Sequence, residues 1–148
     1  MAECAFCAIV ADPSRARVVH QDAHTLAFFP LAPAVRGHTL VIPRSHAPDL
    51  WALDDATAAR LTQSVLRVGR ALYEVLAPDG MNVINSAGAA ASQTVFHVHV
   101  HLVPRWPGDA MGSIWPPKAN RTPEEHGVDR GLDGLAARIA EVTGSGRP

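Results

Sequence analysis

The chain has 148 residues, of which 47% are hydrophobic and 18% are charged, and its formal net charge is -1. This length predicts one domain that buries about two-thirds of the surface of its unfolded chain. The nearly balanced charge argues against a broad nucleic-acid-binding surface. No apolar run approaches the ~20 residues of a transmembrane helix, and the first residues lack the apolar segment of a signal peptide. We therefore expect a soluble, cytoplasmic protein whose partners are neither nucleic acids nor membranes.

The first candidate site is the pair Cys4 and Cys7, in a segment that we expect to form a short helix or turn. Such a pair is typical of a redox-active dithiol, of half a zinc site, or of two small buried residues. A redox role would favour a following βαβ pattern, which the sequence lacks. A zinc site would need two further ligands, and histidines must supply them because the chain has no other cysteine.

Short runs rich in β-branched and aromatic residues predict several strands. The first two are separated by a polar turn at residues 21–23, Pro30 ends the second, and Gly37 permits a tight turn into the third. His20 and His24 have no partner pattern, and we interpret both as exposed surface histidines. These three predicted strands cover residues 17–20, 24–29 and 38–42, and a further short strand is predicted over residues 81–85.

One long helix is expected to begin at residues 53–55, with an acidic first turn, and to stop at residues 78–80. Apolar residues recur along it with helical spacing, which predicts that one side packs in the core. They are Leu61, Val65, Val68, Leu72 and Leu76. The expected fold class is therefore α+β, with an antiparallel sheet of about five strands and the long helix packed on one face.

A fifth strand is predicted over residues 94–104, where histidines alternate with aliphatic residues. This alternation places His97, His99 and His101 on one face and turns the aliphatic side chains toward the core. Imidazole serves as nucleophile, acid, base or metal ligand near neutral pH. The histidine face is therefore a candidate site for metal binding or for covalent catalysis at phosphorus.

Two segments flank this strand. The loop of residues 86–92 consists of small residues, whose backbone N–H groups can approach an anion closely. We interpret it as a phosphate-binding loop, with a plain flexible connection as the alternative. After Arg105 the chain becomes rich in proline and glycine, and residues 132–142 then predict a modest amphipathic helix.

Together these motifs resemble the histidine triad (HIT) family of nucleotide hydrolases and transferases. The resemblance rests on His97–Val103, Gly37–Pro43 with His46, Asn85, and Ser92–Thr94. It implies a HIT-like fold, a homodimer, and a single HIT domain over residues 1–148, with 4–105 as the family core and 106–148 as the tail and C-terminal helix. It also implies a hydrolase or transferase that acts on nucleoside phosphoramidates, or on related nucleotidyl phosphate esters and anhydrides of the dinucleoside polyphosphate type.

The resemblance further implies a catalytic set. His99 would be the nucleophile, attacking the α-phosphorus to give a nucleotidyl-histidine that water then resolves. His101 would bind the phosphate and assist the leaving group, and Gln93 would hold phosphate oxygens. His97 would either bind zinc or orient the other two, with its backbone carbonyl setting the tautomer of His99. The implied ligands of a structural zinc ion are Cys4, Cys7, His46 and His97.

Nucleotide contacts are implied on several segments. The backbone of Thr94 would bind phosphate, Asn85 would face the ribose and phosphate, and His38 would lie behind the triad. Trp115 would either contact the substrate or only anchor the tail. The apolar residues implied to sandwich the base are Phe6, Ile9, Phe28 and Leu31.

One position departs from the family pattern. Many relatives carry an aspartate that binds the ribose hydroxyls where this chain has Pro30, so ribose recognition is expected to differ. Two other interpretations of the site stay open. One is a nucleotide-binding regulatory protein with little turnover, and the other is a metallohydrolase that holds one ion with all three triad histidines.

Overall fold

The computed structural model describes residues 3–117 and 131–144. The chain divides into two compact units, Met1–Gly112 and Ser113–Pro148. The second unit contains α3 (Leu132–Thr143), which confirms the helix predicted near the C-terminus. Residues 118–130 of the predicted tail lie outside the described residues. Within the described ranges, no helix is long and apolar enough to cross a lipid bilayer.

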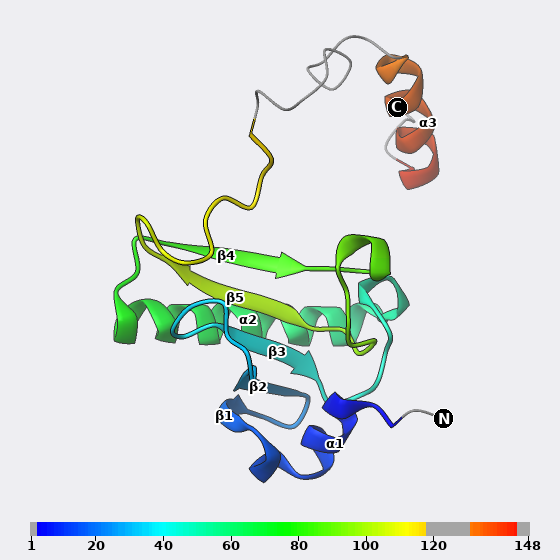
Figure 1. The fold of residues 1–148 in the computed structure, drawn as a ribbon. Helices are drawn as coiled ribbons and strands as arrows, with labels where there is room; N and C mark the ends of the chain where they lie inside the picture. The colour runs from blue at the N-terminus through cyan, green and yellow to red at the C-terminus, as the bar shows by residue number, and fades with distance from the viewer. Residues whose placement is uncertain (1–2, 118–130, 145–148) are drawn as a thin grey trace. The chain divides into compact units, whose positions relative to one another are not determined.

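The strands of the first unit form one antiparallel sheet of five strands in the order β1-β2-β3-β5-β4 (Figure 1). This arrangement confirms the predicted fold class. Strand β5 has a neighbour on each side, because His101 pairs with Leu40 of β3 and with Ile84 of β4. The strands are β1 (Arg17–Gln21), β2 (Thr25–Phe29), β3 (Thr39–Pro43), β4 (Gly80–Asn85) and β5 (Val100–Arg105).

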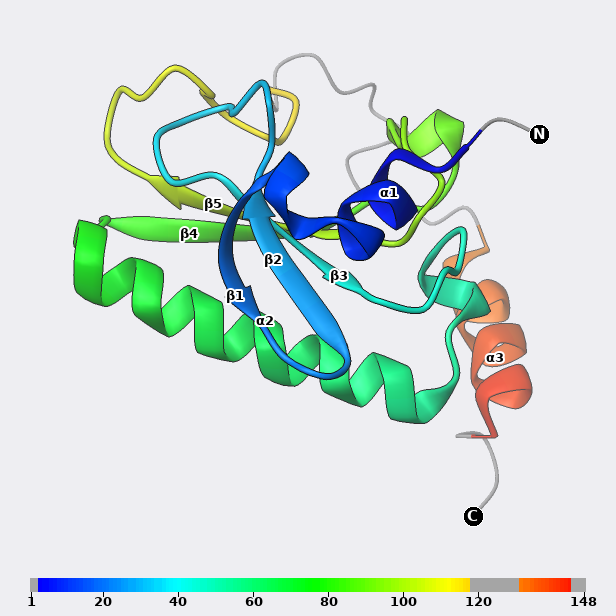
Figure 2. The same ribbon diagram turned by 90° about the horizontal axis from the view of Figure 1, so that it is seen from below.

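Helix α2 (Asp55–Leu76) lies along one face of the sheet (Figure 2). It begins where the Asp54 carboxylate accepts a hydrogen bond of 2.7 Å from the backbone N–H of Thr57. It ends at Ala77, which adopts the left-handed conformation. The core on this face joins α2 to alternate residues of β2, β3 and β5, as the helical spacing predicts. It comprises Ala27, Val41, Ala47, Leu61, Val68, Leu72, Val98, Val100 and Leu102.

The opposite face of the sheet packs against α1 (Ala5–Ala11), a short helix whose one buried residue is Phe6. Phe6 joins a second cluster with Leu26, Phe28, Leu40 and Ile42. Because side chains alternate along a strand, β2 and β3 contribute to both clusters. Residues directly opposite each other in an antiparallel pair share a face. His101, which is opposite Leu40, therefore projects toward the α1 side.

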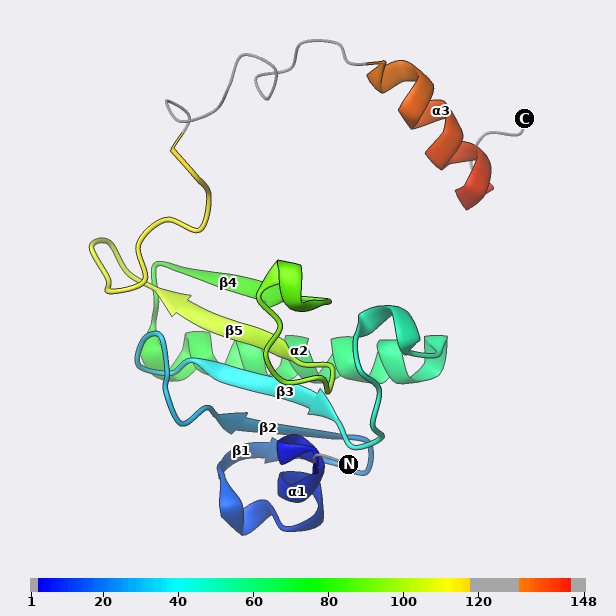
Figure 3. The same cartoon turned by 45° about the vertical axis from the view of Figure 1, so that its right-hand side comes forward.

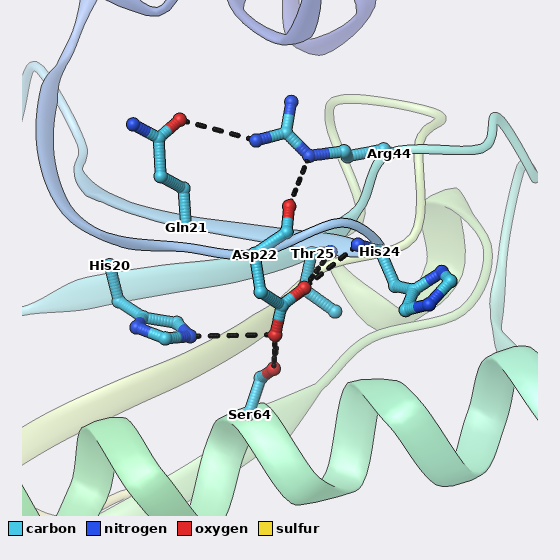
Figure 4. A network of polar contacts seen from close by, with 7 residues as sticks. All are labelled: His20, Gln21, Asp22, His24, Thr25, Arg44 and Ser64. Atoms are coloured by element: carbon cyan, nitrogen blue, oxygen red, sulfur yellow. Dashed lines mark hydrogen bonds and ion pairs between the residues drawn. The ribbon is translucent and has the colours of Figure 1, made fainter.

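The carboxylate of Asp22 holds the turn between β1 and β2 (Figure 4). It accepts hydrogen bonds of 2.8 Å from the backbone N–H groups of His24 and Thr25. Burial would raise the pKa of this carboxyl, but these hydrogen bonds lower the pKa below its ordinary value. His24 is exposed, as predicted. His20 is half-buried beside Asp22, with its Nε2 3.6 Å from Asp22 Oδ2, so the prediction that His20 is an exposed surface histidine is wrong.

The loop after β3 and the loop before β5 lie side by side at one end of the sheet (Figure 3). The backbone N–H of Val98 donates to the carbonyl of Ala47 at 2.8 Å, which joins the two loops. Because β5 begins at Val100, the strand predicted over residues 94–104 is wrong for its first half. The ladder between β3 and β5 ends at the pair Val41 and Val100, so Ile42 and Pro43 of β3 pair only with β2.

Candidate active site

The three histidines of the predicted triad lie around the start of β5. His97 and His99 belong to the loop before the strand, and His101 lies within it. The rings of His99 and His101 are in contact, with centroids 4.9 Å apart. The aliphatic residues between them pack in the α2 core, so the predicted alternation is confirmed although the strand is shorter.

Four metal-binding side chains converge at His97, and their ligand atoms all lie within 4.8 Å of one another. The Nδ1 of His97 is 3.6 Å from the sulfur of Cys4, 3.5 Å from that of Cys7, and 3.3 Å from the Nδ1 of His46. Two sulfurs and two imidazole nitrogens are a typical ligand set of a tetrahedral structural zinc site. The structure thus brings together the four ligands implied by the sequence.

The protonation of these groups also fits a zinc ion. The Nε2 of His97 lies 2.8 Å from the carbonyl oxygen of Pro43, which can only accept, so Nε2 carries the proton and Nδ1 presents a lone pair to the cluster. Burial lowers the pKa of His97, which favours the neutral form that binds metal. Burial and the neighbouring Cys4 raise the pKa of the Cys7 thiol, and a bound dication would offset both effects.

His99 is almost fully buried, at 7% exposure, and backbone groups set its orientation. Its Nδ1 donates to the carbonyl oxygen of His97 at 2.7 Å, as predicted for the tautomer of this ring. The Nε2 of His99 is therefore unprotonated in the neutral ring. The side-chain amide of Asn85 donates to the carbonyl oxygen of His99 at 2.8 Å. One hydrogen bond thus holds the ring of the nucleophile candidate and another holds its backbone carbonyl.

His101 is held by His38, the residue that precedes β3. The backbone N–H of Ala34 donates to His38 Nδ1 at 3.0 Å, so the neutral His38 ring carries its proton on Nε2. That Nε2 lies 2.9 Å from the Nδ1 of His101, which accepts and keeps its own proton on Nε2. Burial, with the charges of His99 and His38, lowers the pKa of His101 to about 4. His101 is therefore a neutral hydrogen-bond donor at neutral pH.

Gln93 is buried and joins three backbone segments. Its Oε1 accepts from the N–H of Gly88 at 2.7 Å, within the loop predicted to bind phosphate. Its Nε2 donates to the carbonyls of Pro48 at 2.6 Å and of Val95 at 3.1 Å. Both amide hydrogens are thus used within the protein, so Gln93 shapes the loop in this conformation. Its predicted contact with phosphate stays a prediction.

The residues predicted to sandwich a base lie in different surroundings. Phe6 and Phe28 are buried against each other, with ring centroids 5.4 Å apart, and Ile9 packs at the edge of the same cluster. Leu31, in the loop after β2, is fully exposed at 102%. Trp115 belongs to the second unit and is exposed at 72%, so its contact with substrate also stays a prediction.

The sequence indicated the carbonyl that sets the tautomer of His99 but not the backbone groups that set the tautomers of His97 and His38. The carbonyl of Pro43 and the N–H of Ala34 are each essential to the protonation pattern of a histidine. Sequence reasoning also placed His38 behind the triad without its direct bond to His101. Every residue except proline offers the same backbone groups, so no residue-type signal marks the ones that are used.

The fold and the site together define a class of protein. It is a small α+β protein in which an unprotonated imidazole nitrogen at the start of β5 lies beside a neutral imidazole donor, next to a centre of two cysteines and two histidines. The chain belongs to the HIT domain family, whose model matches residues 12–108.

Individual relatives agree with this assignment. The chain is 37% identical over 113 residues to Protein hit of Bacillus subtilis, which covers 76% of this chain and 78% of that protein. A crystal structure of a HIT family member from Bacillus subtilis is 33% identical, with a TM-score of 0.80, and covers 94% of this chain and 96% of that one. A zinc-bound histidine triad family protein from Mycobacterium smegmatis is 38% identical, with a TM-score of 0.69, and covers 95% and 94% respectively.

Proposed function

We propose that this protein is a nucleotidyl hydrolase or transferase whose nucleophile is His99. The proposed substrates are nucleoside phosphoramidates or related nucleotidyl phosphate esters and anhydrides, including dinucleoside polyphosphates. The observation that carries the proposal is the hydrogen bond of 2.7 Å from His99 Nδ1 to the carbonyl of His97. It leaves the Nε2 lone pair available on a buried, oriented ring, as nucleophilic catalysis by imidazole requires.

In the proposed reaction, His99 Nε2 attacks the α-phosphorus, and a P–N bond forms while the bond to the leaving group breaks. The leaving group departs with the electron pair of that bond. The protonated Nε2 of neutral His101 donates to a phosphoryl oxygen or to the leaving atom. Water then attacks the nucleotidyl-histidine, which releases a nucleoside monophosphate and regenerates His99. An alcohol or phosphate in place of water gives transfer.

We assign the nucleotide contacts to residues around this nucleophile. The Asn85 amide nitrogen donates a hydrogen bond to the carbonyl of His99, and we assign its Oδ1 to the region of the ribose and phosphate. The Thr94 backbone and Gln93 are assigned to the phosphate. To donate to the phosphate, the Gln93 amide would give up its longer hydrogen bond, the 3.1 Å bond to the Val95 carbonyl. The base is assigned to Ile9, Phe28 and Leu31, whereas the ring of Phe6 is buried against His99 and Phe28.

We also propose a structural zinc ion at Cys4, Cys7, His46 and His97. When bound, it would tie α1 to the loop after β3, which carries His46, and to the loop before β5, which carries His97. The geometric and protonation fit of the four ligands supports it, as does the zinc-bound relative. Within the described part of the chain, the converging metal ligands include neither His99 nor His101, which disfavours a catalytic ion held by the whole triad.

The proposed working form is a cytoplasmic homodimer. Strand β4 lies at one edge of the sheet, and its Val83 is 59% exposed. A second copy of the chain would cover such an edge, which otherwise presents unpaired backbone groups.

Intact-protein mass spectrometry after rapid mixing with a panel of nucleoside phosphoramidates and dinucleoside polyphosphates tests the proposal. We expect a transient gain of one nucleotidyl group, removed again as nucleoside monophosphate accumulates. Product release without any adduct at millisecond times would replace covalent catalysis by direct attack of water. No product from any substrate in the panel would leave a binding protein instead of an enzyme.

A further inference from the structure

Phe6 lies on α1 between the two cysteines of the metal cluster, and its ring contacts His99. The two ring centroids are 5.2 Å apart with an interplanar angle of 88°, which is an edge-to-face contact. The same ring lies 6.0 Å from His97 and 5.4 Å from Phe28. Only 8% of Phe6 is exposed. Protein atoms thus take up most of the ring surface that would otherwise be open to a nucleobase.

This contact adds something that the hydrogen bond of His99 lacks. The bond from Nδ1 to the His97 carbonyl holds one edge of the imidazole. The terminal torsion of a histidine side chain has a broad profile, so the plane of the ring needs further restraint. A ring packed against the imidazole restricts that rotation. The direction of the Nε2 lone pair is then set, and reaction rates depend steeply on such alignment.

Helix α1 is too short to hold Phe6 in place by itself. It has only 7 residues, and helices of this length are marginal without tertiary support. Cys4 caps it, because its sulfur accepts from the backbone N–H of Cys7 at 3.4 Å. Both sulfurs face His97, which lies 93 and 90 positions further along the chain. A metal ion held by the sulfurs would tie α1, and Phe6 with it, to the loop that carries the nucleophile.

We propose that Phe6 is a positioning residue for His99 and that ligation of Cys4 and Cys7 keeps Phe6 in position. This inference rests on the proposed function, because it concerns the same nucleophile. It assigns the Phe6 ring to the alignment of His99 instead of to the base. It also gives the metal centre a role in ordering the active site without contact with the substrate.

Steady-state kinetics of Phe6→Leu test the first half of the inference, with Val10→Ala as the matched control. Val10 lies on the same helix and packs against the same cluster. Phe6→Leu is expected to lower kcat about tenfold or more with little change in KM. Phe6→Tyr, which restores the ring, should recover most of the loss, and Val10→Ala should lower Tm but not kcat. A raised KM at unchanged kcat would assign the ring to substrate binding and overturn the proposal.

A second measurement does not depend on turnover. NMR relaxation of the His99 ring carbons, recorded at one pH, reports the mobility of that ring. We expect mobility to increase in Phe6→Leu and in the unsubstituted protein after removal of zinc, and to stay low in Val10→Ala. Unchanged mobility in Phe6→Leu overturns the role of Phe6, and unchanged mobility without zinc overturns the role of the cysteines. If no substrate is turned over, the proposed function fails while this comparison still decides the positioning.

Discussion

The Nε2 of His38 lies 2.9 Å from the Nδ1 of His101, and this contact decides which nitrogen of His101 carries the proton. The direction of the bond is set one step further back, where the Ala34 N–H donates to His38 and forces its proton onto Nε2. Burial lowers the pKa of both imidazoles. The pair therefore stays neutral at neutral pH, and one N–H remains free to act on the substrate.

We predict that the free energy of unfolding falls as the pH is lowered from 6.5 to about 4. The pKa of His101 is about 4 in the folded protein, against an ordinary value of 6.5. Between these values the unfolded chain binds a proton that the folded protein does not, so acid favours unfolding. Above this window His101 is neutral in both states and its contribution is constant. Burial lowers the pKa of His38 as well, which acts in the same direction. Denaturant unfolding at a series of pH values measures the slope.

His101→Asn is the variant that isolates this effect, and its slope across the same window should be shallower. Both proteins are compared free of zinc, because protonation of the ligands also weakens metal binding in acid. Equal slopes would show that another group dominates the acid sensitivity.

His99→Asn is predicted to abolish turnover while nucleotide affinity stays within about tenfold of the unsubstituted protein. Asparagine keeps a side-chain N–H for the His97 carbonyl and removes little volume, but it has no nucleophilic lone pair. Product formation and nucleotide binding are measured separately, by chromatography and calorimetry. Substantial activity in this variant would move the nucleophile elsewhere.

Metal analysis is predicted to find about one zinc ion per chain, with Zn–S near ~2.3 Å and Zn–N near ~2.0–2.1 Å. Cys4→Ser removes one ligand and should lower Tm markedly. The loss of kcat should be no larger than in Phe6→Leu, because the ion supplies no step of the reaction. X-ray absorption and thermal denaturation measure the two effects. Zinc-free protein of unchanged stability would contradict this prediction.

Pro30 is predicted to weaken discrimination between ribo- and deoxyribonucleotides. A carboxylate at this position would make charge-assisted hydrogen bonds to the ribose, each worth roughly 1.5–3 kcal/mol. Proline has no side-chain acceptor. We expect ribo and 2′-deoxy forms of one substrate to differ by less than about tenfold in kcat/KM, or roughly 1.4 kcal/mol.

Pro30→Asp should widen this gap, which is measured by kinetics with the ribo and 2′-deoxy substrates in competition. A gap of about a hundredfold or more in the unsubstituted protein would mean that another residue binds the ribose. The first candidate is then Asn85, whose Oδ1 is left for the substrate by its bond to His99.

The sequence alone was sufficient for the features that depend on local spacing. Alternation along an extended chain places His97, His99 and His101 on one side and their aliphatic neighbours in the α2 core. The alternation holds even for the residues that precede the start of β5. The spacing of Cys4 and Cys7 places two sulfurs within reach of one ion. Such relations arise between residues close in the chain, where backbone geometry leaves few alternatives.

Contacts between distant residues were decided by the tertiary structure. The strand begins at Val100, where the ladder with β3 ends, and the carbonyl of Pro43 orients a histidine 54 positions away. His38 meets His101 across 63 positions. The alternation of residues fixes which way each imidazole points, but the proton on each ring depends on backbone partners. A backbone N–H or carbonyl has the same chemistry at nearly every position, so the sequence does not mark which of them will be partners. Only the folded chain brings them within hydrogen-bonding distance of the rings.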